Sequence, residues 1–310
     1  MLTGIDHIII GVHDLDSAAE QFGQQLGLRS SGGGMHPGGG TANRIIVIGE
    51  TYLELIAVRT PHEAQQSLLE RLAKGEGYLN MVLGSDDLAA DSEAMRRRGV
   101  PLIGPTVGQL RSADGRARGW LRVDIERSEL AQHYPFLIQH DSAGEERRFR
   151  LAGWAQPPQH PLGATRILSA TITVENLVEA AQRFAHIYGL EPSEAFTGEA
   201  DGWDAMLVSF PLGAGSQHLE LAMPVPLAAE EDAEVGMSHL PDAGALRNHL
   251  ANYGESVCRM TLAVESLDEA RRYLDAHEVT YTYQVEAMRP VLWIHPDYAR
   301  GASIVLHERQ

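Results

Sequence analysis

The stretch IDHIIIGVHDLDSAAEQFGQQLGL, residues 5–28, joins an apolar run to an amphipathic pattern. Asp14 stands between the two, and its side chain can accept a hydrogen bond from the free N–H groups of a first helical turn. After it, apolar residues recur every three or four positions, as on one face of a helix: Leu15, Ala18, Ala19, Phe22 and Leu26. Gly27 follows where a left-handed residue would end the helix. The stretch therefore predicts a strand followed by a helix.

The same pattern occurs four times in the 310 residues. The other copies begin at Tyr78, Ile167 and Val257, and Asp87, Asn176 and Ser266 occupy the capping positions. Glu179 and Glu269 add the acidic residue of a capping box in the third and fourth copies. Gly99 and Gly189 match Gly27, whereas the fourth copy has Glu278 near that place, so its helix is expected to end differently. Because strand-like runs follow each helix, we predict an α+β fold of four βαβββ modules.

The modules are expected to pair into two domains. Residues 1–145 hold modules one and two, and residues 165–310 hold modules three and four. Residues 146–164 contain three turn-forming prolines, Pro157, Pro158 and Pro161, and are predicted to be a linker.

Composition excludes several classes of protein. The formal net charge is −17, which repels phosphate backbones and makes nucleic acid an unexpected partner. No apolar run approaches the roughly 20 residues that span a bilayer, so no membrane partner is expected. The N-terminal residues MLTGIDHIII lack the features of a secretory signal, and the single cysteine, Cys258, cannot form an internal disulfide. A cytoplasmic location follows as the expectation.

The repeated βαβββ module resembles the vicinal oxygen chelate superfamily, which includes glyoxalase, bleomycin-resistance proteins and extradiol dioxygenases. The segments IDHIII (5–10), HPGGGTANRI (36–45) and YLELIAV (52–58) are similar to its glyoxalase-like subgroup. The resemblance covers nearly the whole chain. It implies that each pair of modules forms a cupped half-barrel, with metal ligands on the first and last strands of each module.

Carried over residue by residue, the resemblance implies that His7 and Glu54 bind a divalent metal such as Zn, Mn, Fe or Ni in the N-terminal cup. Asn80 stands where extradiol dioxygenases have a second histidine, and His36 is the obvious additional ligand. Glu54 can serve as a ligand, as a general base, or as both by turns. The alternative for His7 is a core histidine with one satisfied nitrogen.

The C-terminal cup differs. Ser169, Arg259 and Val305 occupy its ligand positions and leave Glu220 without companions for a metal. We therefore predict that Arg259 replaces the cation and pairs with Glu220, and that this half is structural or binds an anion.

The glycine-rich segment from Ser30 to Asn43 contains six glycines. It can be a cover over the cup that brings His36, Thr41 and Asn43 to a ligand, or a plain hairpin connection. Trp120 is a candidate cup lining, although large aromatic residues are more often plain core.

Three hypotheses of function follow. The first is a small-molecule enzyme of lyase or isomerase type, in which a divalent metal chelates vicinal substrate oxygens, with Glu54 and His36 as catalytic groups and Asn80, Thr41, Asn43 and Trp120 around the ligand. The second is a metal-free protein that sequesters an apolar compound. The third is a structural homo-oligomer, for example a homodimer, formed through exposed sheet edges.

Overall fold

The computed structural model describes residues 1–30, 32–126, 134–193, 196–197, 205–225, 244–286 and 289–309. The first module comprises β1 (Leu2–Gly11), α1 (Leu15–Gln24), β2 (Gly33–His36), β3 (Thr41–Ile48) and β4 (Thr51–Val58), and α2 (Gln66–Ala73) follows it. The second comprises β5 (Gly77–Ser85), α3 (Leu88–Arg97), β6 (Leu102–Ser112), β7 (Ala117–Ile125) and β8 (Phe136–His140), and α4 (Gly144–Ala152) follows it.

The second half repeats this order. The third module has β9 (Ala164–Thr173), α5 (Leu177–Tyr188), β10 (Phe196–Thr197), β11 (Ala205–Leu212) and β12 (Gln217–Pro224), with α6 (Gly244–Tyr253) after it. The fourth has β13 (Ser256–Val264), α7 (Leu267–Ala276), β14 (Tyr281–Glu286), β15 (Arg289–Ile294), the short 3₁₀-helix η3 (Pro296–Ala299) and β16 (Ser303–Glu308). The predicted α+β fold of four βαβββ modules is confirmed. No helix among the described residues is long and apolar enough to cross a membrane.

All four predicted helix caps form. Each capping side chain accepts a hydrogen bond from the backbone N–H three residues later, and the capping residues are Asp14, Asp87, Asn176 and Ser266. Each such bond satisfies one of the N–H groups that a first helical turn leaves without a partner.

The end of the fourth helix corrects a prediction. Gly27, Gly99 and Gly189 adopt positive φ angles of 61°, 82° and 67°, and Glu278 adopts the same left-handed conformation with φ 55°. The fourth helix thus ends like the others, although a side chain at positive φ carries a steric cost that glycine avoids. The turn geometry is repeated even where the residue that favours it is missing.

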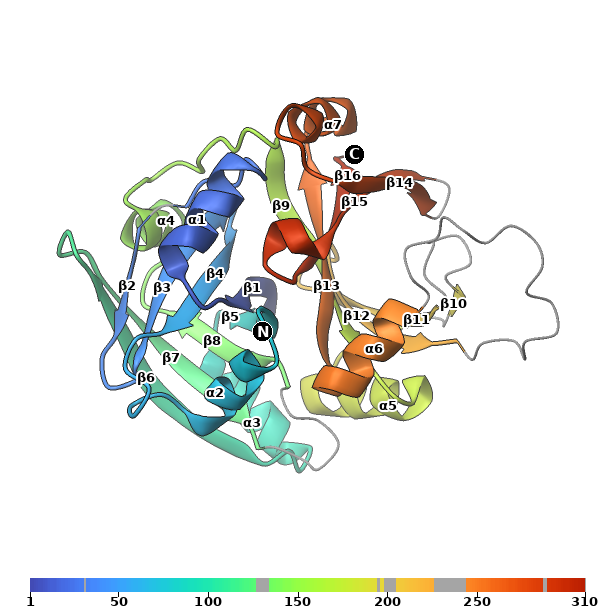
Figure 1. Ribbon diagram of the computed structural model, residues 1–310. Coiled ribbons are helices and arrows are strands. Elements are labelled where there is room, and N and C mark those ends of the chain that lie inside the picture. Colours follow the sequence, from blue (N-terminus) through green and yellow to red (C-terminus); the bar gives the residue numbers. More distant parts are fainter. Residues whose placement is uncertain are drawn as a thin grey trace.

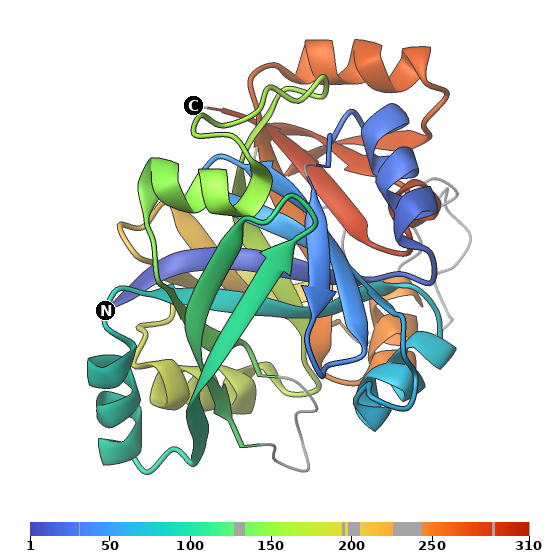
Figure 2. The same cartoon turned by 90° about the vertical axis from the view of Figure 1, so that its left-hand side faces the viewer.

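The two sheets differ in closure. In the N-terminal half, the strands form a closed barrel in the order β1-β4-β3-β2-β6-β7-β8-β5, whereas the C-terminal half is an eight-stranded sheet in the order β10-β11-β12-β9-β13-β16-β15-β14. The N-terminal half therefore goes beyond the half-barrel that we expected. The short pairing of β2 with β6, at Gly34 with Ser112 and Met35 with Arg111, closes it. In Figure 2 the long green hairpin of β6 and β7 lies beside the blue strands of the first module.

The predicted linker is partly helical. Residues 144–152 form α4, whose Leu151 and Ala152 pack on Ile45, Val47 and Tyr52. These two apolar residues at the end of the helix explain why this part of the range is ordered against the barrel. The prolines follow α4 and precede β9.

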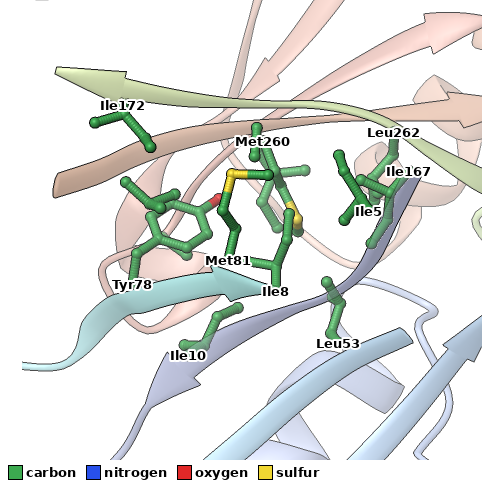
Figure 3. Packing of buried hydrophobic residues seen from close by; sticks show 14 of the residues in the cluster. Ile5, Ile8, Ile10, Leu53, Tyr78, Met81, Ile167, Ile172, Met260 and Leu262 are labelled. Carbon is green, nitrogen blue, oxygen red and sulfur yellow. The ribbon is translucent and has the colours of Figure 1, made fainter. Parts of the chain in front are cut away.

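The two halves share one hydrophobic core. β1 and β5 of the barrel lie against β9 and β13 of the second sheet (Figure 1). Figure 3 shows the side chains that meet there: Ile5, Ile8, Ile10, Leu53, Tyr78, Met81, Ile167, Ile172, Met260 and Leu262. Because side chains alternate along a strand, Ile8 and Ile10 enter this shared core while His7 and Ile9 line a pocket inside the barrel.

Candidate functional site

His7 and Glu54 meet inside the barrel. They lie on the parallel neighbours β1 and β4, where His7 is paired in register with Tyr52 and Glu54 with Ile9. His7 Nε2 lies 3.5 Å from Glu54 Oε2, and both residues are buried. The imidazole stacks on the ring of Tyr52 with 4.4 Å between the ring centroids. The inward, mutually facing arrangement on which the predicted chemistry depends is present.

Asp6 fixes the orientation of His7. A register shift between Ile5 and His7 interrupts the pairing of β1 with β5, and such a bulge can re-aim a side chain. Asp6 Oδ1 lies 2.7 Å from His7 Nδ1, so the Nε2 atom is left for the pocket. Asp6 also accepts a hydrogen bond from Arg147 at 2.6 Å and contacts His140 Nε2 at 3.2 Å. Burial alone would raise the pKa of Asp6, but Arg147 and His140 hold it well below its usual value.

Glu54 is held as a carboxylate. Asn43 Nδ2 donates to Glu54 Oε1 at 2.5 Å, and His36 Nε2 lies 3.6 Å from the same oxygen. Burial alone would raise the pKa of Glu54, whereas the hydrogen bonds with His7 and Asn43 bring it far below the usual value. Burial likewise tends to lower the pKa of His7, but its contacts with Asp6 and Glu54 raise it overall. His7 thus lies between two carboxylates that favour its protonated form.

The glycine-rich segment supplies three polar groups to the site. β2 and β3 pair as a hairpin in which His36 is opposite Thr41, and His36 Nδ1 lies 2.9 Å from Thr41 Oγ1. Asn43 accepts a hydrogen bond from the backbone N–H of Gly34 while it donates to Glu54. Burial lowers the pKa of His36, so its imidazole is neutral at neutral pH. The hairpin is therefore part of the wall of the site.

A cavity of about 310 Å³ is lined by four members of this cluster: His7, His36, Thr41 and Glu54. Its lining joins the polar cluster to apolar and aromatic side chains, among them Ile9, Tyr52, Trp120, Phe136 and Ile138. Arg118 and Arg122, both on β7, complete the wall. A small, mostly apolar pocket with a few convergent polar groups is the usual form of a small-molecule site.

Asn80 stands apart from this cluster. Its Nδ2 donates to the carbonyl of Tyr134, and its side chain borders an adjoining cavity rather than the one around His7. In the pairing of β1 with β5, Asn80 is opposite Ile9, and Val82 is opposite His7.

Sequence reasoning missed Asp6 and Arg118. Asp6 precedes His7, and ordinary strand alternation would place it on the other face; the bulge that brings it in has no sequence signal that we recognise. Arg118 did have a signal, because Arg118, Trp120 and Arg122 alternate along β7 and so share one face of the strand.

The C-terminal half has the predicted ion pair. Arg259 Nη2 lies 3.8 Å from Glu220 Oε2, and Thr171 Oγ1 donates to the same oxygen at 2.6 Å. The prediction that Arg259 pairs with Glu220 is confirmed.

Within the described part of the chain, no group of three or more His, Cys, Asp or Glu side chains is gathered tightly enough to hold a metal ion as it stands. The donor types nevertheless fit one. Two imidazole Nε2 atoms approach a single carboxylate, and each imidazole carries an outer partner at Nδ1, Asp6 for His7 and Thr41 for His36. Metal-binding histidines are typically oriented in this way.

A family model described as "Glyoxalase-like domain" matches residues 5–188. The chain belongs to this family, within the vicinal oxygen chelate superfamily. The match covers both modules of the barrel, and hence the whole site, and extends through α5. No curated protein matches the sequence.

Solved structures support the architecture over the full length. A hypothetical protein from Staphylococcus aureus superposes with a TM-score of 0.65 at 15% identity, with 100% of both chains covered. A mutant of 4-hydroxymandelate synthase from Streptomyces coelicolor gives a TM-score of 0.65 at 14% identity, covering 100% of this chain and 95% of its own. At these identities the likeness shows the fold alone.

Proposed function

We propose that this chain is a small-molecule enzyme whose reaction takes place in the barrel pocket, with a divalent metal held by His7 and Glu54 and with His36 beside them as the proton acceptor. One observation carries the proposal: two imidazole Nε2 atoms lie 3.5 and 3.6 Å from the oxygens of one buried carboxylate, at the edge of a cavity of ligand size. Zinc, manganese, iron and nickel all accept such a donor set. Asn80 has no role in this arrangement.

The metal, when bound, would supply Lewis-acid polarisation of adjacent oxygen atoms of a substrate. The protein's own groups prepare that position. Asp6 keeps the Nδ1 proton of His7 and turns Nε2 inward, while Asn43 restrains Glu54. Because ligating imidazoles must be neutral, metal binding would displace the second proton of His7.

The lowered pKa of Glu54 bears on its role. A carboxylate stabilised by His7 and Asn43 is a weak base, so Glu54 suits the role of ligand better than that of proton acceptor. His36 is the better acceptor, because its lowered pKa leaves the imidazole neutral beside the pocket. Proton transfer next to a polarised carbonyl is the chemistry of lyases and isomerases, and we assign the chain to that class.

Metal analysis of untagged protein tests this proposal. Wild-type protein and His62→Ala, which changes a histidine with an 82% exposed side chain, should carry equal metal, whereas His7→Ala should carry none. His36→Ala separates two roles: lost metal marks His36 as a ligand, and retained metal with lost turnover marks it as the proton acceptor. Glu220→Gln should keep full metal content, because Glu220 pairs with Arg259 and is not expected to bind the metal.

The second candidate is a metal-free binding protein. The aromatic and aliphatic lining of the pocket favours it. Absence of metal from wild-type protein under every loading condition would replace the enzyme proposal with this one.

A further inference from the structure

In the part of the chain that the structure describes, the barrel pocket contains a buried cation without a counter-ion. Arg118 is only 6% exposed, and its Nε and Nη1 atoms are buried without a hydrogen-bond partner among the described residues. Burying an unpaired charge is costly, so such groups are normally paired. The side chain lines the same pocket as His7 and Glu54.

Other arginines in the structure show what a paired cation looks like here. The buried Arg148 contacts Glu50, and the buried Arg259 faces Glu220. Arg122, two residues after Arg118 on the same strand, is neutralised by Asp124 through contacts of 2.6 and 2.8 Å. Among the described residues, no carboxylate forms an ion pair with Arg118. Its charge is therefore available to a ligand.

The surroundings of Arg118 define the rest of that ligand. The Cζ atom of Arg118 lies 6.0 Å from the ring centroid of Tyr52 and 5.8 Å from that of Trp120. These aromatic neighbours suit a flat or apolar body, while the guanidinium suits a planar anion. A single unpaired positive charge balances a monoanion better than a doubly charged phosphate.

Arg118 and Glu54 lie on opposite walls. In the barrel order β1-β4-β3-β2-β6-β7-β8-β5, β7 is four strands from β4 in either direction. The guanidinium of Arg118 nevertheless comes within 6.0 Å of the ring of Tyr52, which stacks on His7. A ligand whose anionic group is bound by Arg118 would thus lie next to His7 and Glu54.

We propose that the pocket binds an apolar or aromatic carboxylic acid, with its carboxylate on Arg118 and its body against the aromatic lining beside the His7–Glu54 pair. Calling this ligand a substrate rests on the proposed function; the binding itself does not require a metal. Arg118 would thus restrict the substrates to molecules that carry a carboxylate.

The test compares benzoate with its neutral isostere benzamide in calorimetric titrations of EDTA-treated protein. Wild-type protein should bind benzoate at millimolar concentration or below and benzamide at least about tenfold more weakly, because charge-assisted hydrogen bonds are lost. Arg118→Gln should lower benzoate affinity by about tenfold to a hundredfold and abolish the preference. Arg118→Lys should restore part of it, since the charge remains without the guanidinium geometry.

Arg116→Gln is the control and should keep the preference for benzoate, because Arg116 pairs with Asp114 and does not line the pocket. Thermal unfolding of each variant without ligand distinguishes a loss of binding from a loss of folding. Since an unpaired buried charge is removed, Arg118→Gln should melt at the wild-type temperature or above it.

Three results would overturn the proposal: no benzoate binding to wild-type protein, equal benzoate affinity in wild-type protein and Arg118→Gln, or binding that requires added metal. A protein that never binds metal but still binds benzoate through Arg118 would disprove the proposed enzyme and leave this inference standing.

Discussion

Asp6 and His7 are consecutive residues of β1, yet their side chains meet at 2.7 Å between Oδ1 and Nδ1. The bulge at this point places both residues at the polar cluster, so the carboxylate can fix which imidazole nitrogen faces the pocket. Asp6 in turn depends on Arg147 from α4. The chemistry of β1 is thus linked to a helix that follows the last strand of the barrel.

Asp6→Asn tests the orienting contact. An amide cannot supply the negative charge that favours the Nδ1 proton of His7, so zinc affinity should fall about tenfold to a hundredfold. Calorimetric titration with zinc measures it, with circular dichroism to confirm folding. Asp114→Asn, on the turn between β6 and β7, is the control and should bind like wild type. Equal affinities in both variants would remove Asp6 from the site.

Two arginines of α4 should differ sharply in their effect on stability. Arg147 pairs with the buried Asp6, and Arg147→Ala should lower the free energy of unfolding by about 3–5 kcal/mol because a buried charge loses its partner. Arg150 pairs with the exposed Asp141 and Glu146, so Arg150→Ala should cost less than about 1 kcal/mol. Urea denaturation compares them. Similar losses in both variants would show that Asp6 does not depend on Arg147.

The repeated pattern of caps and apolar faces was enough to predict the four modules, because each signal is local: a capping side chain, a helical stripe and a turn glycine lie within one segment. His7, Glu54, His36, Thr41 and Asn43 were also gathered correctly, because the resemblance placed the first two and the hairpin that carries the others adjoins β4.

The features that the sequence did not predict depend on contacts between strands that are far apart in the chain and on closure of the barrel. Asn80 lies outside the cavity around His7 because its side chain turns to the carbonyl of Tyr134, a contact that no pattern along its own strand indicates. Barrel closure depends on two residue pairs between β2 and β6, which no local pattern marks. Arg118 is a candidate ligand-binding residue because its guanidinium is buried without an ion-pair partner among the described residues, and only the three-dimensional structure shows this.

The turn at Glu278 offers a test of backbone strain. Glu278→Gly should raise the free energy of unfolding by about 1 kcal/mol, because glycine adopts φ near 55° without steric cost. Gly99→Ala is the reciprocal variant: an added Cβ would meet no atom within 4 Å, so any loss reflects the backbone at φ 82° alone. Urea denaturation should show that the free energy of unfolding rises in Glu278→Gly and falls in Gly99→Ala. A loss of stability in Glu278→Gly would mean that the glutamate side chain contributes more than its strained backbone costs.

His249, on α6, predicts an acid-sensitive step in stability outside the site. Burial, assisted by the charge of Arg71, lowers the pKa of His249 to about 4, and its Nε2 lies 2.9 Å from Ser256 Oγ. Between an unfolded value near 6.5 and this folded value, the unfolded chain binds more protons, so stability is full above about pH 6.5 and falls as the pH drops toward 4.

The slope that His249 adds is at most about 1.4 kcal/mol per pH unit. His249→Gln removes that titration, and its urea midpoint should therefore decrease less than the wild-type midpoint between pH 7 and pH 4.5. The variant loses some stability at pH 7 through the contact with Ser256, so the comparison is between slopes and not between absolute values. The other buried histidines contribute equally to the pH dependence of both proteins, so their contributions cancel in the difference between the slopes. Parallel slopes would place the acid sensitivity elsewhere, with His36 and His140 the next groups to change, because burial lowers the pKa of both.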